Sequence, residues 1–220
     1  MYTIQDLFDL SHTRAAAYLA GFTYPWEALD SIGEAIMQLG PTLDPDAYDH
    51  PQENVWIAKS ATVAPTASIT GPCIIGEKTE VRQCAFIRGN ALVGDGCVVG
   101  NSTELKNVIL FDGVQVPHYN YVGDSILGWH SHMGAGSITS NVKSDKSLVV
   151  IHDGQERMET GRKKVGAMLA DDVEIGCGSV LNPGTVVGKG SRVYPLTSVR
   201  GVIPAGHICK QDGTKVEIRK

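Results

Sequence analysis

The chain has 220 residues, of which 42% are hydrophobic, and its formal net charge is −5. This length suits one large domain or one domain with an appendage, and the acidic balance disfavours nucleic acid or an anionic membrane surface as the main partner. No apolar run approaches the length that crosses a bilayer, and the N-terminus lacks a basic stretch followed by an apolar core. We therefore expect a cytoplasmic protein with no membrane or nucleic-acid partner.

The first part of the chain, residues 1–50, predicts a helical appendage. Thr3 with Asp6 suits the start of a short helix, and Pro25 suits the first turn of a longer helix that Gly40 ends. The apolar residues of the longer helix are Trp26, Leu29, Ile32, Ile36 and Leu39. We expect the appendage to cap the open end of the domain that follows, because a terminal coil leaves strand edges and apolar interior exposed.

A strict repeat of six residues begins at residue 57. Its aliphatic positions are Ile57, Val63, Ile69, Ile75, Val81, Ile87, Val93, Val99 and Leu105, and its compact positions are Ala61, Ala67, Cys73, Thr79, Ala85, Ala91, Cys97 and Thr103. A helix would repeat after about 3.6 residues and a strand after two, so the period fits neither. It is typical of a hexapeptide β-helix, an all-β coil of three short strands in which residues 18 apart stack at about 4.8 Å.

The repeat slips by one residue between Leu105 and Leu110, and again between Val122 and Leu127. It resumes at Leu169, Ile175, Leu181, Val187, Val193 and Val199. We therefore expect the β-helix to span residues 51–208 and a C-terminal tail to occupy residues 209–220.

The five cysteines show neither metal-ligand nor disulfide spacing. Cys73 and Cys97 fall at compact inward positions of the repeat, so we expect both to be core thiols. The sequence predicts no metal site.

The period disappears between residues 141 and 165. An aliphatic run there is followed by Asp153-Gly154, a dipeptide typical of hairpin turns, and then by the basic residues Arg162, Lys163 and Lys164. We therefore expect a hairpin extruded from the β-helix. A loop of this length is usually either functional or disordered, and the hairpin signal favours a functional one.

Two basic residues, Arg88 and Lys106, stand 18 apart and should stack on one face of the β-helix. Two cations about 4.8 Å apart repel each other by on the order of 1 kcal/mol even in water. A bound phosphate would offset this repulsion. The alternative is a pair of exposed side chains that splay apart.

Four sequence blocks run through the repeat, namely residues 88–91 (RGNA), 100–106 (GNSTELK), 117–124 (PHYNYVGD) and 134–141 (GAGSITSN). With their spacing, they resemble the acetyltransferase half of bifunctional glucosamine-1-phosphate acetyltransferase/N-acetylglucosamine-1-phosphate uridyltransferase. The stretch from residue 160 to residue 184 is similar to archaeal-type sugar-1-phosphate nucleotidyltransferases that carry the same β-helix.

The resemblance implies a left-handed parallel β-helix that forms a homotrimer with sites completed across subunits. It implies a coenzyme-A-dependent N-acetyltransferase that uses acetyl-coenzyme A to acetylate an amino-sugar phosphate, most simply glucosamine 1-phosphate, in UDP-N-acetylglucosamine synthesis. We expect no uridyltransferase or pyrophosphorylase activity, because no nucleotide-binding domain with a Gly-x-Gly-Thr-Arg loop precedes the repeat.

The family's catalytic residues match His118, as the base, and Glu104, which orients it. Its substrate-binding residues match Arg88, Lys106, Tyr121 and Asn141, and His132 replaces an asparagine of the sugar pocket. On the cofactor side the resemblance implies a backbone contact from Ala135, Cys177 in place of a serine near the thioester, and the basic residues Arg162 and Lys163.

The chemistry of these residue types fits amide formation from a thioester. A histidine with an ordinary pKa of about 6.5 can accept the proton of the attacking amine at neutral pH, so His118 suits a general base. A carboxylate such as Glu104 would stabilise the imidazolium, and a backbone N–H within residues 134–136 could bond the thioester oxygen as it gains charge.

Two other functions remain open. Some hexapeptide β-helices are carbonic anhydrases that bind zinc through three histidines, and His118, His130 and His132 are candidates, although their spacing differs from that pattern. The other alternative is a non-catalytic relative of sugar nucleotidyltransferases that binds a sugar nucleotide or a partner enzyme.

Overall fold

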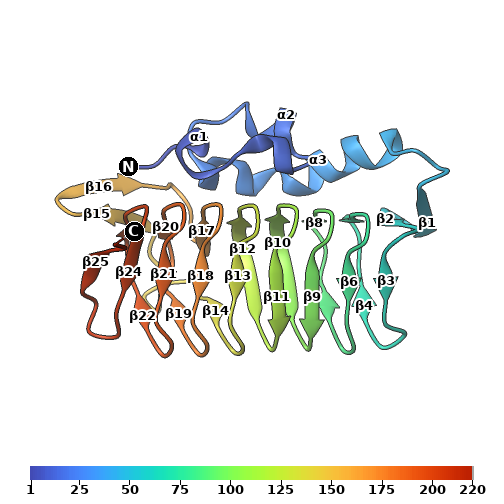
Figure 1. Ribbon diagram of the computed structural model, residues 1–220. Coiled ribbons are helices and arrows are strands. Elements are labelled where there is room, and N and C mark those ends of the chain that lie inside the picture. The colour runs from blue at the N-terminus through green and yellow to red at the C-terminus, as the bar shows by residue number, and fades with distance from the viewer. Residues whose placement is uncertain (220) are drawn as a thin grey trace.

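Residues 18 apart lie side by side in the structure, as the period of six predicts. In the computed structural model, which describes residues 1–219, Val55 pairs with Cys73, Thr62 with Glu80 and Phe86 with Glu104, all in parallel strands. The coils stack into a long parallel β-helix whose strands form a 14-stranded and a nine-stranded sheet (Figure 1). The predicted hexapeptide β-helix is therefore confirmed.

The helical elements all precede residue 43. They are α1 (Ile4–Leu7), η1 (Leu10–His12), α2 (Ala16–Leu19), η2 (Pro25–Asp30), α3 (Ile32–Leu39) and η3 (Gly40–Thr42), where η marks 3₁₀-helix.

The strands fill the rest of the chain. In the first half they are β1 (Tyr48–Gln52), β2 (Val55–Ala58), β3 (Thr62–Val63), β4 (Ser68–Ile69), β5 (Cys73–Ile75), β6 (Glu80–Val81), β7 (Phe86–Ile87), β8 (Ala91–Val93), β9 (Val98–Asn101), β10 (Glu104–Leu110), β11 (Gln115–His118) and β12 (Tyr121–Leu127). In the second half they are β13 (His132–Met133), β14 (Ile138–Thr139), β15 (Val150–Asp153), β16 (Glu156–Glu159), β17 (Ala167–Leu169), β18 (Glu174–Ile175), β19 (Val180–Leu181), β20 (Thr185–Val187), β21 (Arg192–Val193), β22 (Ser198–Val199), β23 (Val202–Ile203), β24 (His207–Cys209) and β25 (Lys215–Glu217).

The aliphatic side chains of the repeat fill the interior of the β-helix. The six aliphatic positions from Ile75 to Leu105 are each at most 1% exposed. Burying one such side chain contributes about 1.5 to 3 kcal/mol, so the column is the main source of stability. Cys73 and Cys97 are free and buried, and burial raises the pKa of each thiol to about 12, which confirms both as core thiols.

The two slips of the repeat change the shape of two coils. Strands β10 and β12 each run for seven residues and pair with each other along their length, from Glu104 opposite Tyr121 to Leu110 opposite Leu127. Elsewhere in the β-helix most strands have two to four residues. Because each slip shortens the turn by one residue, two short strands merge into one long strand that continues around a corner of the β-helix.

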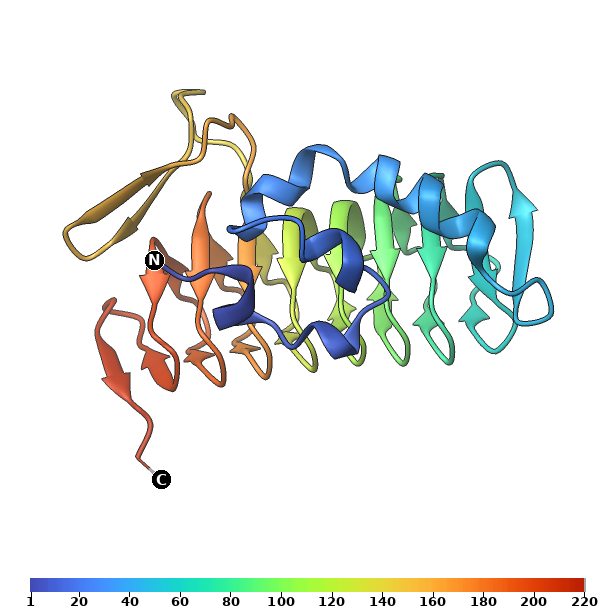
Figure 2. The same ribbon diagram turned by 90° about the horizontal axis from the view of Figure 1, so that it is seen from above.

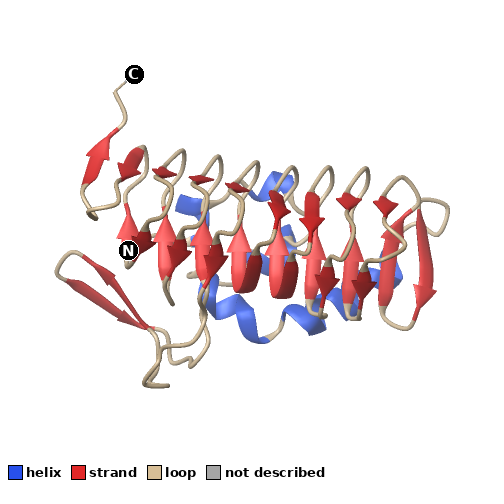
Figure 3. Cartoon of the chain, turned by 90° about the horizontal axis from the view of Figure 1, so that it is seen from below, coloured by secondary structure: helices blue, strands red, loops and turns tan. Residues whose placement is uncertain are grey.

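The predicted appendage, residues 1–50, covers the end of the β-helix only through its last residues, because Tyr48 and Asp49 of β1 pair with Ala58 and Ile57 of β2. The helical part, residues 1–47, does not cap that end, so the prediction is wrong for it. Figures 1 and 2 show it lying along the length of one side, and Figure 3 shows all helices on that side. The backbone carbonyls of Leu7 and His12 accept hydrogen bonds from the N–H groups of Asp171 and Asp112, at 3.1 and 3.0 Å. Backbone carbonyls of the segment and N–H groups in the turns of the coils each need a hydrogen-bond partner. By pairing with one another they fix the segment along several coils rather than over the terminal coil.

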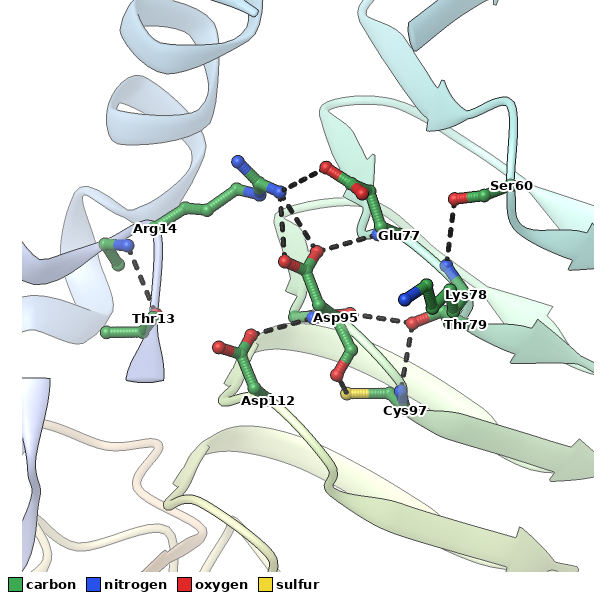
Figure 4. Close-up of polar contacts among 11 residues, drawn as sticks. Thr13, Arg14, Ser60, Glu77, Lys78, Thr79, Asp95, Cys97 and Asp112 are labelled. Carbon is green, nitrogen blue, oxygen red and sulfur yellow. Dashed lines mark hydrogen bonds and ion pairs between the residues drawn. The ribbon is translucent and has the colours of Figure 1, made fainter. Parts of the chain in front are cut away.

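An arginine anchors this segment to two coils. The Nη2 atom of Arg14 donates to Asp95 Oδ2 at 3.0 Å and to Glu77 Oε1 at 3.3 Å (Figure 4). Asp95 Oδ1 also accepts the N–H of Glu77 at 2.7 Å. These stacked carboxylates join neighbouring coils and hold the segment against them.

The predicted helices form with one change. Thr3 and Asp6 make a capping box at the start of α1, as expected. The longer helix divides into η2 and α3, because Ser31 between them leaves helical geometry at φ −117° and ψ 18°. Trp26, Leu29, Ile32 and Ile36 are all buried, so the predicted apolar face is the one that packs on the β-helix.

The predicted hairpin forms from β15 and β16, which pair antiparallel around Gly154 at φ +58°. Figure 1 shows it projecting beside the last coils. At the C-terminus β25 pairs antiparallel with β24. Among residues 1–219, no helix combines the length and apolar character needed to span a membrane.

Close stacking of coils makes one glycine essential for folding. A Cβ atom added at Gly100 would lie 1.5 Å from the carbonyl oxygen of Pro117 on the next coil. We predict that Gly100→Ala lowers the free energy of unfolding by at least about 3 kcal/mol, because two backbones must separate.

The matched control is Gly96→Ala. Gly96 has φ +63°, but no atom lies within 4 Å of an added Cβ. Only backbone strain of about 1 kcal/mol should result. Denaturant unfolding of both variants checks the prediction, and equal losses of stability would contradict it.

Candidate functional site

A corner of the β-helix carries a column of polar residues in left-handed conformation. Asn90, Asn107 and Asp124 have φ values of +49°, +55° and +48°. Val108 pairs with Ala91 on one side and with Ser125 on the other, so the three residues that precede them sit at one corner of successive coils. Asparagine and aspartate tolerate this conformation better than other non-glycine residues, which explains their presence at these turns.

Hydrogen bonds lock the side chains of this corner. Asn107 Nδ2 donates to Asp124 Oδ1 at 2.9 Å and to the carbonyl of Leu29 at 3.0 Å. Asn141 Nδ2 donates to Asp124 Oδ2, so both oxygens of this 6%-exposed carboxylate are bonded. Asn141 Nδ2 also donates to the Tyr121 hydroxyl at 3.2 Å. The structure thus brings the predicted residues Tyr121 and Asn141 together.

A pocket of about 510 Å³ opens at this corner. Its basic side chains are those of Lys106, Arg162, Lys163 and Lys164, and its acidic side chains are those of Asp30 and Asp124. Both Nη atoms of Arg162 bond the carboxylate of Asp30 from the N-terminal segment. The structure therefore places Arg162 and Lys163, expected on the cofactor side, beside Lys106.

The stacking of Arg88 below Lys106 is as predicted, since Ile87 pairs with Leu105 and Arg88 N–H bonds the carbonyl of Leu105. Arg88 does not line the pocket, however. Its Nη1 atom donates to Glu104 Oε1 at 2.6 Å. The carboxylate expected to orient His118 is thus paired with Arg88, because the opposite charge one coil away lies within direct reach.

A second corner carries the predicted base. His118 ends β11 and is exposed. Gly136 N–H bonds the carbonyl of His118, and Gly178 N–H bonds that of Ala135, both at 2.9 Å. His118, Ala135 and Cys177 therefore form an accessible column on three successive coils, in which Ala135 and Cys177 are exposed as well.

A buried asparagine fixes this second corner. Asn120, 2% exposed, accepts the N–H of His118 at 3.1 Å and donates to the carbonyls of Gly134 and Ser137 at 2.9 and 3.0 Å. The turn that carries His118 is thereby tied to the turn that carries Ala135.

One face of the β-helix connects the two corners. It is built from residues 104–106, 121–123 and 138–140, which pair side by side. Three residues of strand span about 10 Å, which suits the size of a sugar phosphate. Tyr121 lies along this face, because Gly123 has no side chain and an added Cβ would lie 2.4 Å from the tyrosine hydroxyl. Burial, chiefly, raises the pKa of Tyr121.

His132 lies elsewhere. It begins β13, and its Nδ1 atom is 2.5 Å from Glu174 Oε1, in a pocket with His130 and Gln115. In a single subunit His132 does not line the pocket that contains Lys106. In the described part of the chain, no group of three histidine, cysteine or carboxylate side chains could hold a metal ion.

Sequence reasoning missed Asn107, Asp124 and Asp30. The first two could have been found, because the slip places them one shortened coil apart and both are residues that favour left-handed turns. Asp30 gives no such signal, since it meets Arg162 across 132 positions of sequence.

Comparisons with known proteins agree with this architecture. The family model of the GMPPB C-terminal domain matches residues 69–187, which is more than half of the chain. The chain is 29% identical to a bifunctional sugar-1-phosphate nucleotidylyltransferase/acetyltransferase of Sulfurisphaera tokodaii over 57% of this chain and 31% of the relative. It is 30% identical to the bifunctional protein GlmU of Clavibacter sepedonicus over 80% of this chain and 31% of the relative.

The chain thus spans about a third of the length of these curated relatives. Their names confirm the family resemblance predicted from the four sequence blocks. Among solved structures, a hexapeptide transferase family protein from Anaplasma phagocytophilum superimposes with a TM-score of 0.42 at 16% identity, over 76% of this chain and 81% of that chain.

Proposed function

Because the chain belongs to the GMPPB C-terminal domain family, we propose that it is an acyltransferase of the sugar-phosphate type. Its reaction is the transfer of acetyl from acetyl-coenzyme A to the amine of an amino-sugar phosphate, most simply glucosamine 1-phosphate. The observation that carries the proposal is the face between the two corners, which has an exposed histidine at one end and a basic pocket at the other. Curated relatives that join an acetyltransferase to a sugar-1-phosphate nucleotidylyltransferase support the same substrate class.

In the proposed reaction the amine nitrogen attacks the thioester carbonyl. The C–N bond forms, the C–S bond breaks to release coenzyme A, and His118 accepts the proton that the amine loses. The N–H groups of Gly134 and Gly136 bond neighbouring coils. Those two N–H groups are therefore already used, and we assign the N–H of Ala135, which lies between them, as the hydrogen-bond donor to the thioester oxygen as negative charge develops there.

The pocket residues take the acceptor's phosphate. Lys106, Lys163 and Lys164 present ammonium groups, and the side-chain carbonyl oxygen of Asn90 beside them suits a sugar hydroxyl. Coenzyme A then lies along the column of Ala135 and Cys177, where glycine turns leave room for its pantetheine arm.

The first test concerns the base. We predict that His118→Ala lowers turnover by about 10² to 10⁴, while thermal stability and coenzyme A binding stay nearly unchanged. A thiol-release assay with acetyl-coenzyme A measures turnover. The matched control is His50→Ala, which removes an exposed histidine on β1, far along the β-helix from the candidate site. Turnover equal in the two variants would contradict the assignment.

The second test concerns the phosphate. Lys106→Met keeps the apolar stem but removes the charge, so KM for the phosphorylated amino sugar should rise about ten- to a hundredfold. KM for acetyl-coenzyme A should change little. Lys210→Met, near the C-terminus, controls for the loss of one positive charge. Equal use of phosphorylated and free amino sugar by the parent protein would contradict a phosphate role for the pocket.

The third test concerns assembly. We predict a homotrimer in which the hairpin or His132 of one subunit completes the face of its neighbour, since a closed head-to-tail ring of three subunits repeats the same interface three times. Light scattering at micromolar concentration measures the mass. A fully active monomer would contradict this prediction.

A further inference from the structure

The pocket contains an ion pair that links the N-terminal segment to the β-helix. Both Nη atoms of Arg162 bond the two carboxylate oxygens of Asp30. The arginine side chain is 14% exposed, whereas the aspartate side chain is 81% exposed. The buried Nε atom of Arg162 meets no hydrogen-bond partner within residues 1–219.

The backbone that carries Asp30 is fixed although its side chain is open to solvent. The neighbouring residue Leu29 is 1% exposed, and its carbonyl accepts a hydrogen bond from Asn107 Nδ2 at 3.0 Å. Asp30 therefore stays at the edge of the pocket, while its carboxylate can rotate away from the arginine without moving the segment.

The charges of the pocket are unbalanced. Four basic side chains line it, and of its two carboxylates Asp124 is already bonded through both oxygens to the amides of Asn107 and Asn141. Of these two carboxylates, only Asp30 forms an ion pair with a basic residue of the pocket, namely Arg162. A two-point contact with guanidinium is the geometry that carboxylates and phosphates share.

We propose that Asp30 occupies the place of an anionic group of the acceptor, and that a phosphate entering the pocket displaces Asp30 from Arg162. Arg162 then donates to the phosphate through the nitrogens that Asp30 held. Asp30 is thus a specificity-determining residue: a phosphate, often doubly charged, competes for the arginine, and an uncharged sugar does not. The identity of the acceptor rests on the proposed function, but the exchange at Arg162 does not.

The test measures binding of inorganic phosphate by calorimetry in the full chain. Asp30→Asn keeps the size of the side chain and removes its charge, so phosphate should bind about three- to tenfold more tightly. Glu34→Gln removes a charge from an exposed residue of the same segment without touching Arg162, and it should leave phosphate affinity within about twofold. Thermal melts show whether each variant folds.

A second comparison isolates the contact. In an Arg162→Lys background, which cannot form the two-point pair, Asp30→Asn should change phosphate affinity less than it does in the parent. Unchanged or weaker phosphate binding in Asp30→Asn alone would overturn the proposal, because Asp30 would then position Arg162 rather than stand in for an anion. These outcomes do not depend on acetyl transfer, so a chain without that activity would refute the proposed function and leave this inference intact.

Discussion

The positions of the candidate site residues on the β-helix depend on the hydrogen bonds between successive coils. Parallel pairing fixes each residue above the one a coil earlier, so that His118, Ala135 and Cys177 share one corner and Arg88 and Lys106 share one face. The backbones of neighbouring coils lie so close together that Gly100 has no room for a side chain opposite Pro117. The rigid scaffold therefore sets the spacing of the candidate site, and side chains add little freedom.

Departures from the six-residue repeat create the basic pocket of the candidate site. Removing one residue per coil turns β10 and β12 into long strands and places Asn107 and Asp124 at left-handed turns. The inserted segment 141–165 then brings three basic residues over that corner. A perfect repeat would lack this pocket, whereas these two irregularities give a corner with hydrogen-bonding amides and a concentration of positive charge.

Much of this was predictable from sequence. The period of six fixed the interior from Ile75 to Leu105, and Asp153-Gly154 marked the hairpin, because local chemistry determines both. Packing over long sequence distances was not predictable. The N-terminal segment lies along the side of the β-helix because Arg14 and the carbonyls of Leu7 and His12 find partners on several coils. No periodic signal in residues 1–50 specifies those partners.

The partners of the basic residues show how the chain offsets the positive charge of the candidate site. Stacked cations repel each other, and the sequence left two outcomes open, a bound anion or side chains that splay apart. The chain supplies the anions itself: Glu104 neutralises Arg88, and Asp30 neutralises Arg162. Both members of the Arg88–Glu104 pair are partly exposed, whereas in the other pair Arg162 is largely buried and Asp30 is largely exposed. Solvent at Asp30 weakens that pair relative to a fully buried one. An ion pair with one solvent-exposed partner is one that an anion can displace, which is the basis of the exchange proposed at Arg162.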